Sequence, residues 1–277
     1  MTIRELELQA VKTRRDLLTM IHHANTGHTG GSLSSADIMT ALYFEVLDIN
    51  PQNPSWQGRD YFILSKGHCV EGYLAVLAAR GFFPQEELRT FSQFKSRLIG
   101  HPNNEIPGIE MNTGALGHGL SIAVGAALGL RKSHKDNRVY VLMGDGEQGE
   151  GSVWEAAMAA SHYKLDNLVA IVDRNHLQIS GTTEDVMNLE PFAERWTSFG
   201  WSVREMDGNN MQEVVSTLKK PPFEGGKPSL IIAHTIKGKG IREMENLAKW
   251  HHGVPDALLF ASAMDQLDRL EKELTHA

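Results

Sequence analysis

Five short apolar runs, each of a length suited to one buried strand, constrain the fold of this chain most. They lie at residues 61–64, 139–143, 168–172, 201–206 and 230–233. Stretches of helical length and composition separate or follow them, at residues 121–133, 152–165, 189–200, 211–220 and 257–274. Strands that alternate with helices are typical of right-handed crossovers, so the pattern predicts a three-layer α/β/α fold with a mainly parallel sheet. Ligands of such sheets bind beyond the carboxyl ends of the strands.

The N-terminal part of the chain predicts two helices on either side of a glycine-rich loop. Apolar residues recur at helical spacing before Gly27, namely Leu6, Val11, Leu17, Leu18 and Ile21. A polar loop follows at residues 24–32, and Ser34 with Asp37 resembles a capping pair for a helix over residues 36–47. The flexible-looking stretch 219–229 leads into one more strand of the same sheet, so we expect a single domain over residues 1–277.

Charge and cysteine content exclude several classes of protein. The net charge of −7 offers no basic surface for a phosphate backbone, which argues against nucleic acid as a partner. No apolar run approaches the roughly 20 residues that span a bilayer, and the charged N-terminus is not built as a signal peptide. Cys69 is the only cysteine, so no disulfide can form within the chain. We therefore expect a cytoplasmic protein with no membrane partner.

Polar residues follow two of the predicted strands at positions suited to a metal ion. Gly144, Asp145 and Gly146 end one strand, and taken alone they also fit a plain tight turn. The next strand delivers Asn175 to the same edge of the sheet. The Asp145 carboxylate, the Asn175 amide oxygen and a nearby backbone carbonyl, such as that of Leu177, suit Mg²⁺ or Ca²⁺ and leave positions open for diphosphate oxygens.

Several motifs together resemble the transketolase family. They are GHTGGSLSSADIMTALYF, LSKGHCVEGYLAVL, GHP, NTGALGHGLSIAVGAALG, GDGEQGEGSVWEAA, DRNHLQISG and TIKGKG, in transketolase order from residue 27 to residue 240. The resemblance covers nearly the whole chain. It implies a thiamine-diphosphate-binding fold, in which the chain forms the domain that holds the diphosphate and the metal.

The resemblance assigns roles around the cofactor. Asp145, Asn175 and the carbonyl of Leu177 match the metal ligands of the family, and Gly146, after Gly144, matches the residue that donates its N–H to the diphosphate.

Histidines and a glycine motif complete the implied site. His68 is similar to the histidine on the diphosphate side of the cofactor. His28 and His101 resemble the pair that faces the sugar hydroxyls and assists proton transfer, while Gly114 and Leu116 match positions near the aminopyrimidine. A single histidine beside Gly or Pro is by itself more typical of an ordinary loop. No HExxH or cysteine-rich spacing indicates zinc.

Further residues follow from the same resemblance. His252 is the preferred match to another active-site histidine, with His251 as the alternative. Glu150 and Glu155 fall where the family has acidic residues in a relay between two active sites of a dimer, although a solvated helix start would also explain them. The sequence departs from the family at His118, where many members have glutamine.

The chain has no room for the rest of a transketolase. In the family, a glutamate of a second domain contacts the far side of the aminopyrimidine, and after residue 240 this chain has only about one long helix left. The resemblance therefore implies a separate C-terminal subunit that carries the pyrimidine-binding domain, with two such pairs forming a heterotetramer. The implied reaction transfers a two-carbon ketol unit from a ketose phosphate to an aldose. The alternatives are a subunit of a deoxyxylulose-phosphate synthase or of a decarboxylating dehydrogenase, or a non-catalytic paralogue.

Overall fold

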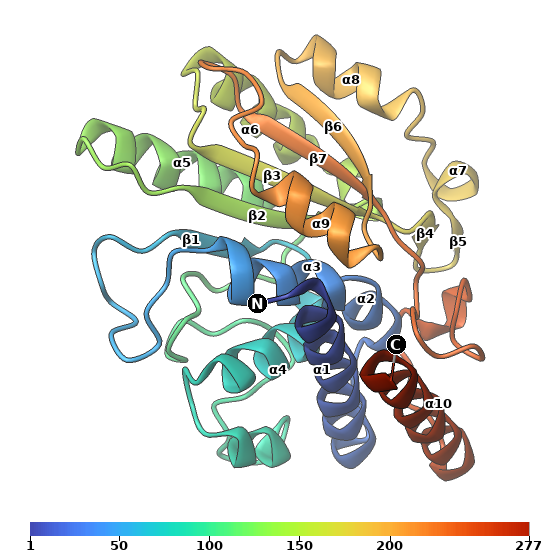
Figure 1. Cartoon of the computed structure of the whole chain (residues 1–277). Coiled ribbons are helices and arrows are strands. Elements are labelled where there is room, and N and C mark those ends of the chain that lie inside the picture. The colour runs from blue at the N-terminus through green and yellow to red at the C-terminus, as the bar shows by residue number, and fades with distance from the viewer. Residues whose placement is uncertain (277) are drawn as a thin grey trace.

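A five-stranded parallel sheet forms the centre of the computed structural model, which describes residues 1–276 (Figure 1). The strands are β1 (Tyr61–Leu64), β2 (Val139–Gly144), β3 (Leu168–Arg174), β6 (Ser202–Asp207) and β7 (Ser229–His234), in the spatial order β1-β2-β3-β7-β6. Every pair in this sheet is parallel. The five predicted strands are confirmed to within one or two residues at each end.

Helices cover both faces of the sheet, because alternate residues of each strand point to opposite sides. On β2, Tyr140 and Leu142 belong to one buried cluster, while Val139, Val141 and Met143 belong to the other. Helices α5 (His118–Lys132), α6 (Gly151–His162) and α8 (Phe192–Ser198) bury the second cluster. The first cluster is buried by α1 (Ile3–Ala24), α3 (Ala36–Ala41), α4 (Val70–Arg80), α9 (Met211–Leu218) and α10 (Ala257–His276). The three-layer α/β/α prediction is confirmed.

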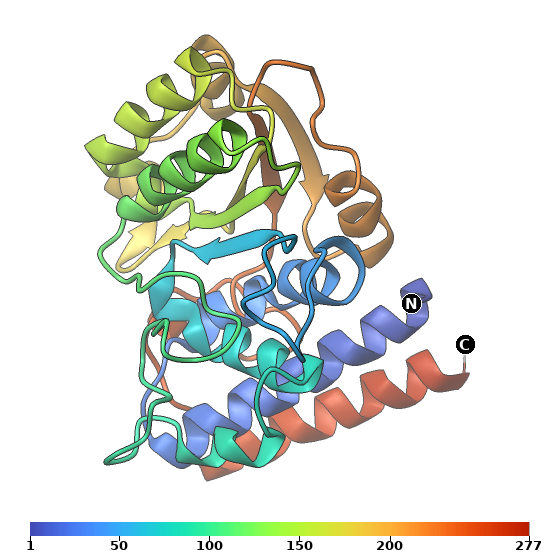
Figure 2. The same ribbon diagram turned by 90° about the vertical axis from the view of Figure 1, so that its left-hand side faces the viewer.

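The first and last long helices lie side by side (Figure 2). Thr2 and Glu5 form a reciprocal capping box that starts α1. Along the pair, Arg15 of α1 donates to Asp268 and Glu271 of α10. Both ends of the chain thus pack on the same core, which supports the single domain that we propose for it. None of the helices within residues 1–276 combines the length and apolarity needed to cross a bilayer.

The segment after Gly27 differs from its prediction. A short buried helix, α2 (Thr29–Ser34), occupies part of the expected loop, and a π-helical turn over Leu42–Val46 ends the next helix. The predicted capping by Ser34 is wrong, since its hydroxyl donates to the Gly31 carbonyl and to Asp173 instead of to a helix start. This buried carboxylate is a stronger acceptor than a carbonyl, so Ser34 is drawn toward the sheet edge.

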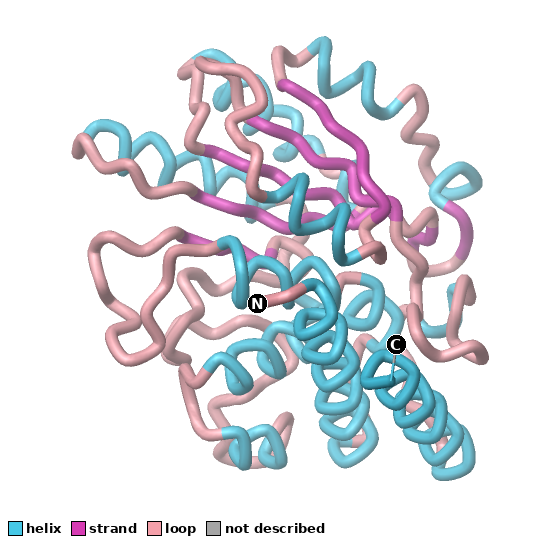
Figure 3. The backbone as a smooth tube through the Cα atoms, in the orientation of Figure 1, coloured by secondary structure: helices cyan, strands magenta, loops and turns pink. Residues whose placement is uncertain are grey.

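Smaller elements complete the chain. A two-stranded antiparallel hairpin, β4 (Leu177–Gln178) with β5 (Gly181–Thr182), precedes the one-turn helix α7 (Thr183–Val186). Short 3₁₀ helices span Gly67–Cys69, Gln85–Thr90, Gly146–Gly149 and Ala248–Trp250. The carboxyl ends of the sheet strands lead into loops, drawn pink in Figure 3, and these loops carry the candidate site.

Candidate active site

A cavity of about 200 Å³ lies at the carboxyl edge of the sheet. Ten of the residues predicted from the sequence line it: His28, His68, Gly114, Leu116, Gly144, Asp145, Gly146, Asn175, Leu177 and His251. They come from segments far apart in the chain and meet because parallel strands end at one edge.

Asp145 and Asn175 extend from the neighbouring strands β2 and β3, and both are buried. The Asp145 carboxylate accepts the backbone N–H of His176 at 2.6 Å and that of Gly146 at 2.8 Å, so it ties the two strand ends together. Burial, together with the nearby Asp173 carboxylate, raises the pKa of Asp145 to about 6. The Arg174 guanidinium, 3.4 Å from Asp145, only partly opposes this rise. A buried carboxylate whose charge is incompletely balanced is a suitable ligand for a further cation.

The donor set around Asp145 fits a hard divalent ion. It combines one carboxylate with the Asn175 amide oxygen, which accepts the Leu177 N–H at 3.2 Å, and with backbone oxygen. These oxygen ligands are the kind that Mg²⁺ and Ca²⁺ prefer. Across residues 1–276 no three His, Cys, Asp or Glu side chains are grouped to hold a metal. An ion here would depend on a bound ligand for its remaining oxygens.

Two glycines allow close approach at the cavity. A Cβ on Gly146 would lie 2.8 Å from the Gln178 side chain of the β4–β5 hairpin. Gly114 has φ +151°, and a Cβ there would lie 2.6 Å from the His101 ring. The Gly146 N–H, predicted to donate to a diphosphate, donates to Asp145 in this structure.

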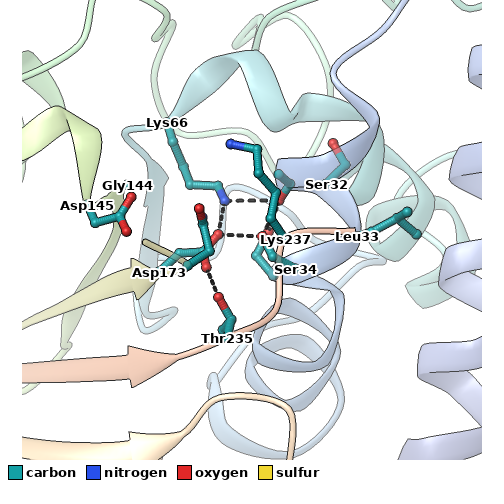
Figure 4. Close-up of polar contacts among 12 residues, drawn as sticks. Ser32, Leu33, Ser34, Lys66, Gly144, Asp145, Asp173, Thr235 and Lys237 are labelled. Atoms are coloured by element: carbon teal, nitrogen blue, oxygen red, sulfur yellow. Dashed lines mark hydrogen bonds and ion pairs between the residues drawn. The ribbon is translucent and has the colours of Figure 1, made fainter. Parts of the chain in front are cut away.

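Asp173 organises the strand ends beside the cavity, as Figure 4 shows. This fully buried carboxylate accepts from Ser34 at 2.6 Å and also from Lys66 and Thr235. Lys66 donates in addition to the Gly31 carbonyl at 2.9 Å. Burial lowers the pKa of Lys66, but the Asp173 charge outweighs it, so the pKa is raised and the ammonium is retained.

Lys237 supplies a second buried ammonium at the cavity. It is 3% exposed, and its Nζ lies 3.4 Å from the Leu177 carbonyl and 3.4 Å from His251 Nδ1, neither of which carries a negative charge. Burial lowers the pKa of Lys237. Because burying a cation without an anion costs free energy, this side chain fits a site for an anionic group such as a diphosphate.

Sequence reasoning gave Lys66, Asp173 and Lys237 no role. All three lie at or just after the ends of strands β1, β3 and β7, at the same edge as Asp145. The rule that selected Asp145 and Asn175 could therefore also have found them.

Four histidines gather at one side of the cavity. The ring centroid of His28 lies 5.1 Å from that of His68, 5.6 Å from that of His251 and 4.7 Å from that of His252. Burial, with help from neighbouring cations and imidazoles, lowers the pKa to about 4 for His28, about 2 for His68 and about 4 for His251. These rings are therefore neutral at pH 7 and can both donate and accept hydrogen bonds.

The remaining predicted residues lie outside the cavity lining. His101 is exposed and borders the site through Gly114. His252 is exposed and packs edge-on against His28, whereas His251 lines the cavity. Glu150 and Glu155 are exposed at the start of α6 and do not reach the cavity of their own chain.

Comparison with known proteins decides the family. Residues 6–258 match the model of the transketolase, thiamine diphosphate binding domain. This chain belongs to the transketolase family. The resemblance of its sequence motifs to those of transketolases is thereby confirmed.

Relatives of two lengths match the chain. An apulose-4-phosphate transketolase subunit of Phocaeicola vulgatus is 52% identical over 277 residues, 99% of each chain. The 6-deoxy-6-sulfo-D-fructose transketolase subunit SqwG of Clostridium sp. is 41% identical over 266 residues, 96% of this chain and 97% of the relative. The transketolase of Homo sapiens is 39% identical over 229 residues, which cover 82% of this chain and 36% of the human protein.

Solved structures show the same relation. The crystal structure of transketolase from Campylobacter jejuni aligns with a TM-score of 0.90 and 31% identity, over 99% of this chain and 46% of that chain. This member of the transketolase family therefore spans about half the length of the solved transketolases that it matches.

Proposed function

We propose that this chain is the N-terminal, thiamine-diphosphate-binding subunit of a split transketolase. Two observations carry the proposal together. The chain matches a protein named as one subunit of a transketolase over 99% of both lengths while covering 46% of a one-chain transketolase, and its cavity collects oxygen ligands, buried lysines and neutral histidines at one sheet edge. The match in length supports a separate subunit. The residues that line the cavity support a catalytic protein rather than a non-catalytic paralogue.

The residues at the cavity divide into two groups in this proposal. Asp145, Asn175 and the Leu177 carbonyl would hold Mg²⁺ or Ca²⁺, and Lys237 with His68 would contact the diphosphate. Thiamine diphosphate, once bound, supplies the electron sink for breaking and forming the carbon–carbon bond.

The remaining histidines would handle the sugar. His28 and His251, neutral at pH 7, would bind substrate hydroxyls and move protons at them, and His101 or His252 would assist from the rim. The fixed positions of these rings at the cavity orient the substrate. Glu150 and Glu155, on the surface at the start of α6, would act only across a contact with another copy.

A companion subunit is part of the proposal. It would carry the pyrimidine-binding domain and close the open side of the cavity, and two such pairs would form a heterotetramer. The obligate interface would bury about 2,000 Å² or more. We propose a cytoplasmic location, because a chain with a single cysteine forms no internal disulfide, which fits a reducing compartment.

For the substrate we propose a ketose phosphate, with apulose 4-phosphate as the first candidate because a relative named for it is 52% identical over the whole chain. A 6-deoxy-6-sulfo ketose, which carries a sulfonate in place of the phosphate, is the alternative, because a relative named for it is 41% identical.

Reconstitution tests this function. The chain and its companion subunit, sought in the neighbouring reading frame, would be purified together. The pair would be assayed with Mg²⁺, thiamine diphosphate and an aldose phosphate acceptor on apulose 4-phosphate, xylulose 5-phosphate and 6-deoxy-6-sulfofructose, and separately on pyruvate. We expect ketol transfer from a ketose by the pair and none by either chain alone. Decarboxylation of pyruvate without ketol transfer, or full activity of the single chain, would contradict the proposal.

A further inference from the structure

Glu71 is a buried carboxylate that the proposed chemistry does not use. It lies in the first turn of α4 and is 0% exposed. One oxygen accepts the backbone N–H of His28 at 2.8 Å, and the other accepts the hydroxyl of Ser32 at 2.8 Å. The first contact reaches from α4 to His28, a candidate catalytic histidine at the end of the loop, and the second reaches to the short helix α2 that follows it.

Helix α2 has no capping side chain of its own at its N-terminus. His28 is the N-cap of α2, and its side chain makes no capping hydrogen bond. The acceptor for the backbone N–H of His28 comes instead from another helix, as the carboxylate of Glu71. Gly27, with φ +155°, lies against the same carboxylate, since a Cβ there would come within 2.8 Å of Glu71 Oε1 and 2.6 Å of Ile21. The backbone of Gly27 and the His28 N–H therefore both pack directly against the Glu71 carboxylate.

Residues 27–29 also contact the segment that carries His251 and His252, the other histidines of the cluster. Thr29 donates to the Gly253 carbonyl at 2.5 Å, and the Gly253 N–H donates to the Gly27 carbonyl at 3.3 Å. The segment that carries His251 and His252 is thus attached to the loop that Glu71 fixes.

We propose that Glu71 is a positioning residue for the active site, which sets the place of the His28 imidazole through the backbone of residues 27–32. The inference rests on the proposed ketol-transfer function and names a residue that acts on it without touching the cavity. This role requires a side chain at position 71 whose oxygen accepts the His28 N–H. A glutamine meets this requirement, because its amide oxygen accepts and its NH₂ donates to the Ser32 oxygen, whereas a leucine of similar size does not.

Amide hydrogen exchange in the full chain tests the positioning directly. The variants are Glu71→Leu and Glu71→Gln, with Tyr73→Phe as a matched control. Tyr73 lies on the same helix, and its buried hydroxyl forms hydrogen bonds with Tyr43 and Gly108, not with residues 27–32. We expect Glu71→Leu to speed exchange of the His28 amide by about tenfold or more relative to Tyr73→Phe, with Glu71→Gln within about threefold of the wild type. A His28 amide that exchanges equally in Glu71→Leu and Tyr73→Phe would overturn the inference.

Kinetics of the reconstituted pair give the second measurement. We expect Glu71→Leu to lower kcat by about tenfold or more with KM for the ketose changed less, Glu71→Gln to restore kcat, and Tyr73→Phe to leave it within about threefold. Equal losses in Glu71→Leu and Tyr73→Phe would show a merely structural role. Because the exchange experiment needs no partner or substrate, its outcome stands even if the wild-type pair transfers no ketol unit.

A second pair of variants covers the case in which Glu71→Leu does not fold. Ser32→Ala removes one of the two hydrogen bonds that Glu71 accepts from residues 27–32. Ser35→Ala removes a hydroxyl that donates to the Gly31 carbonyl without touching Glu71. Faster exchange at His28 in Ser32→Ala than in Ser35→Ala supports the inference, and equal rates contradict it.

Discussion

The ammonium of Lys237 lies 3.4 Å from the backbone carbonyl of Leu177, the same oxygen that is proposed as a metal ligand. A cation from the loop after β7 and a carbonyl from the start of β4 thus meet at one point of the cavity. When a diphosphate and a metal ion are bound, the carbonyl would serve the metal and the lysine would serve the diphosphate. The two residues would then exchange their mutual contact for contacts with the ligands.

Replacing Lys237 tests its role toward the anion. Lys237→Met keeps the apolar stem and removes the charge, so thiamine diphosphate should bind the pair at least about tenfold more weakly, roughly 1.4 kcal/mol. Calorimetry in saturating Mg²⁺ measures this, with Lys239→Met in the same loop as the control. Unchanged affinity in Lys237→Met would remove this lysine from the binding site.

The two adjacent histidines should differ in their effect. His251 lines the cavity beside Lys237, while His252 is exposed against His28. We expect His251→Gln to lower kcat/KM of the pair by about a hundredfold and His252→Gln by about tenfold or less. Each variant is the control of the other. A larger loss of kcat/KM in His252→Gln than in His251→Gln would contradict this prediction and would show that His252 turns inward when the companion subunit is bound.

A side chain at Gly114 should lower the stability of the fold. Its φ of +151° and the His101 ring 2.6 Å from a Cβ predict that Gly114→Ala costs about 1–2 kcal/mol of unfolding free energy and displaces His101. Gly125→Ala on α5 is the matched control, since a Cβ there meets nothing within 4 Å and should stabilise the helix by up to about 1 kcal/mol. Chemical denaturation distinguishes the two, and equal effects would contradict the argument from backbone strain.

Glu71 should give the chain a specific dependence of stability on pH. Burial raises the pKa of Glu71 to about 7 from an ordinary value of 4.5, and the hydrogen bonds from His28 and Ser32 only partly oppose this. The folded chain therefore holds a proton that the unfolded chain releases, so the contribution of Glu71 to stability falls as pH rises from about 4.5 to 7, by up to about 3 kcal/mol.

Comparison with Glu71→Gln isolates this effect. The neighbouring groups His28, with its pKa at about 4, and Cys69, with its pKa raised by burial to about 11, are common to both proteins. The wild type should lose stability relative to Glu71→Gln between about pH 5 and pH 7.5 in thermal denaturation. Parallel curves for the two proteins over that range would show that Glu71 does not titrate there.

The sequence was most informative where structure depends on local pattern. Apolar runs such as residues 168–172 predicted the strands, and the position of a polar residue just after a strand predicted Asp145 and Asn175. Contacts between distant segments had no such local sign. Ser34 looked like a helix cap because its true partner, Asp173, lies 139 residues away. Lys66 depends on the same distant carboxylate, and the choice between His251 and His252 depends on how one loop packs on another.

Metal-dependent cofactor binding tests the central claim most directly. The pair would be titrated with thiamine diphosphate by calorimetry in Mg²⁺ and in chelator, with the wild-type chain and with Asp145→Asn and Asn175→Ala. We expect tight binding by the wild type only in Mg²⁺, and a loss of about a hundredfold or more in either variant. Equal binding with and without the metal, or undiminished binding in both variants, would contradict a site built on the ends of β2 and β3.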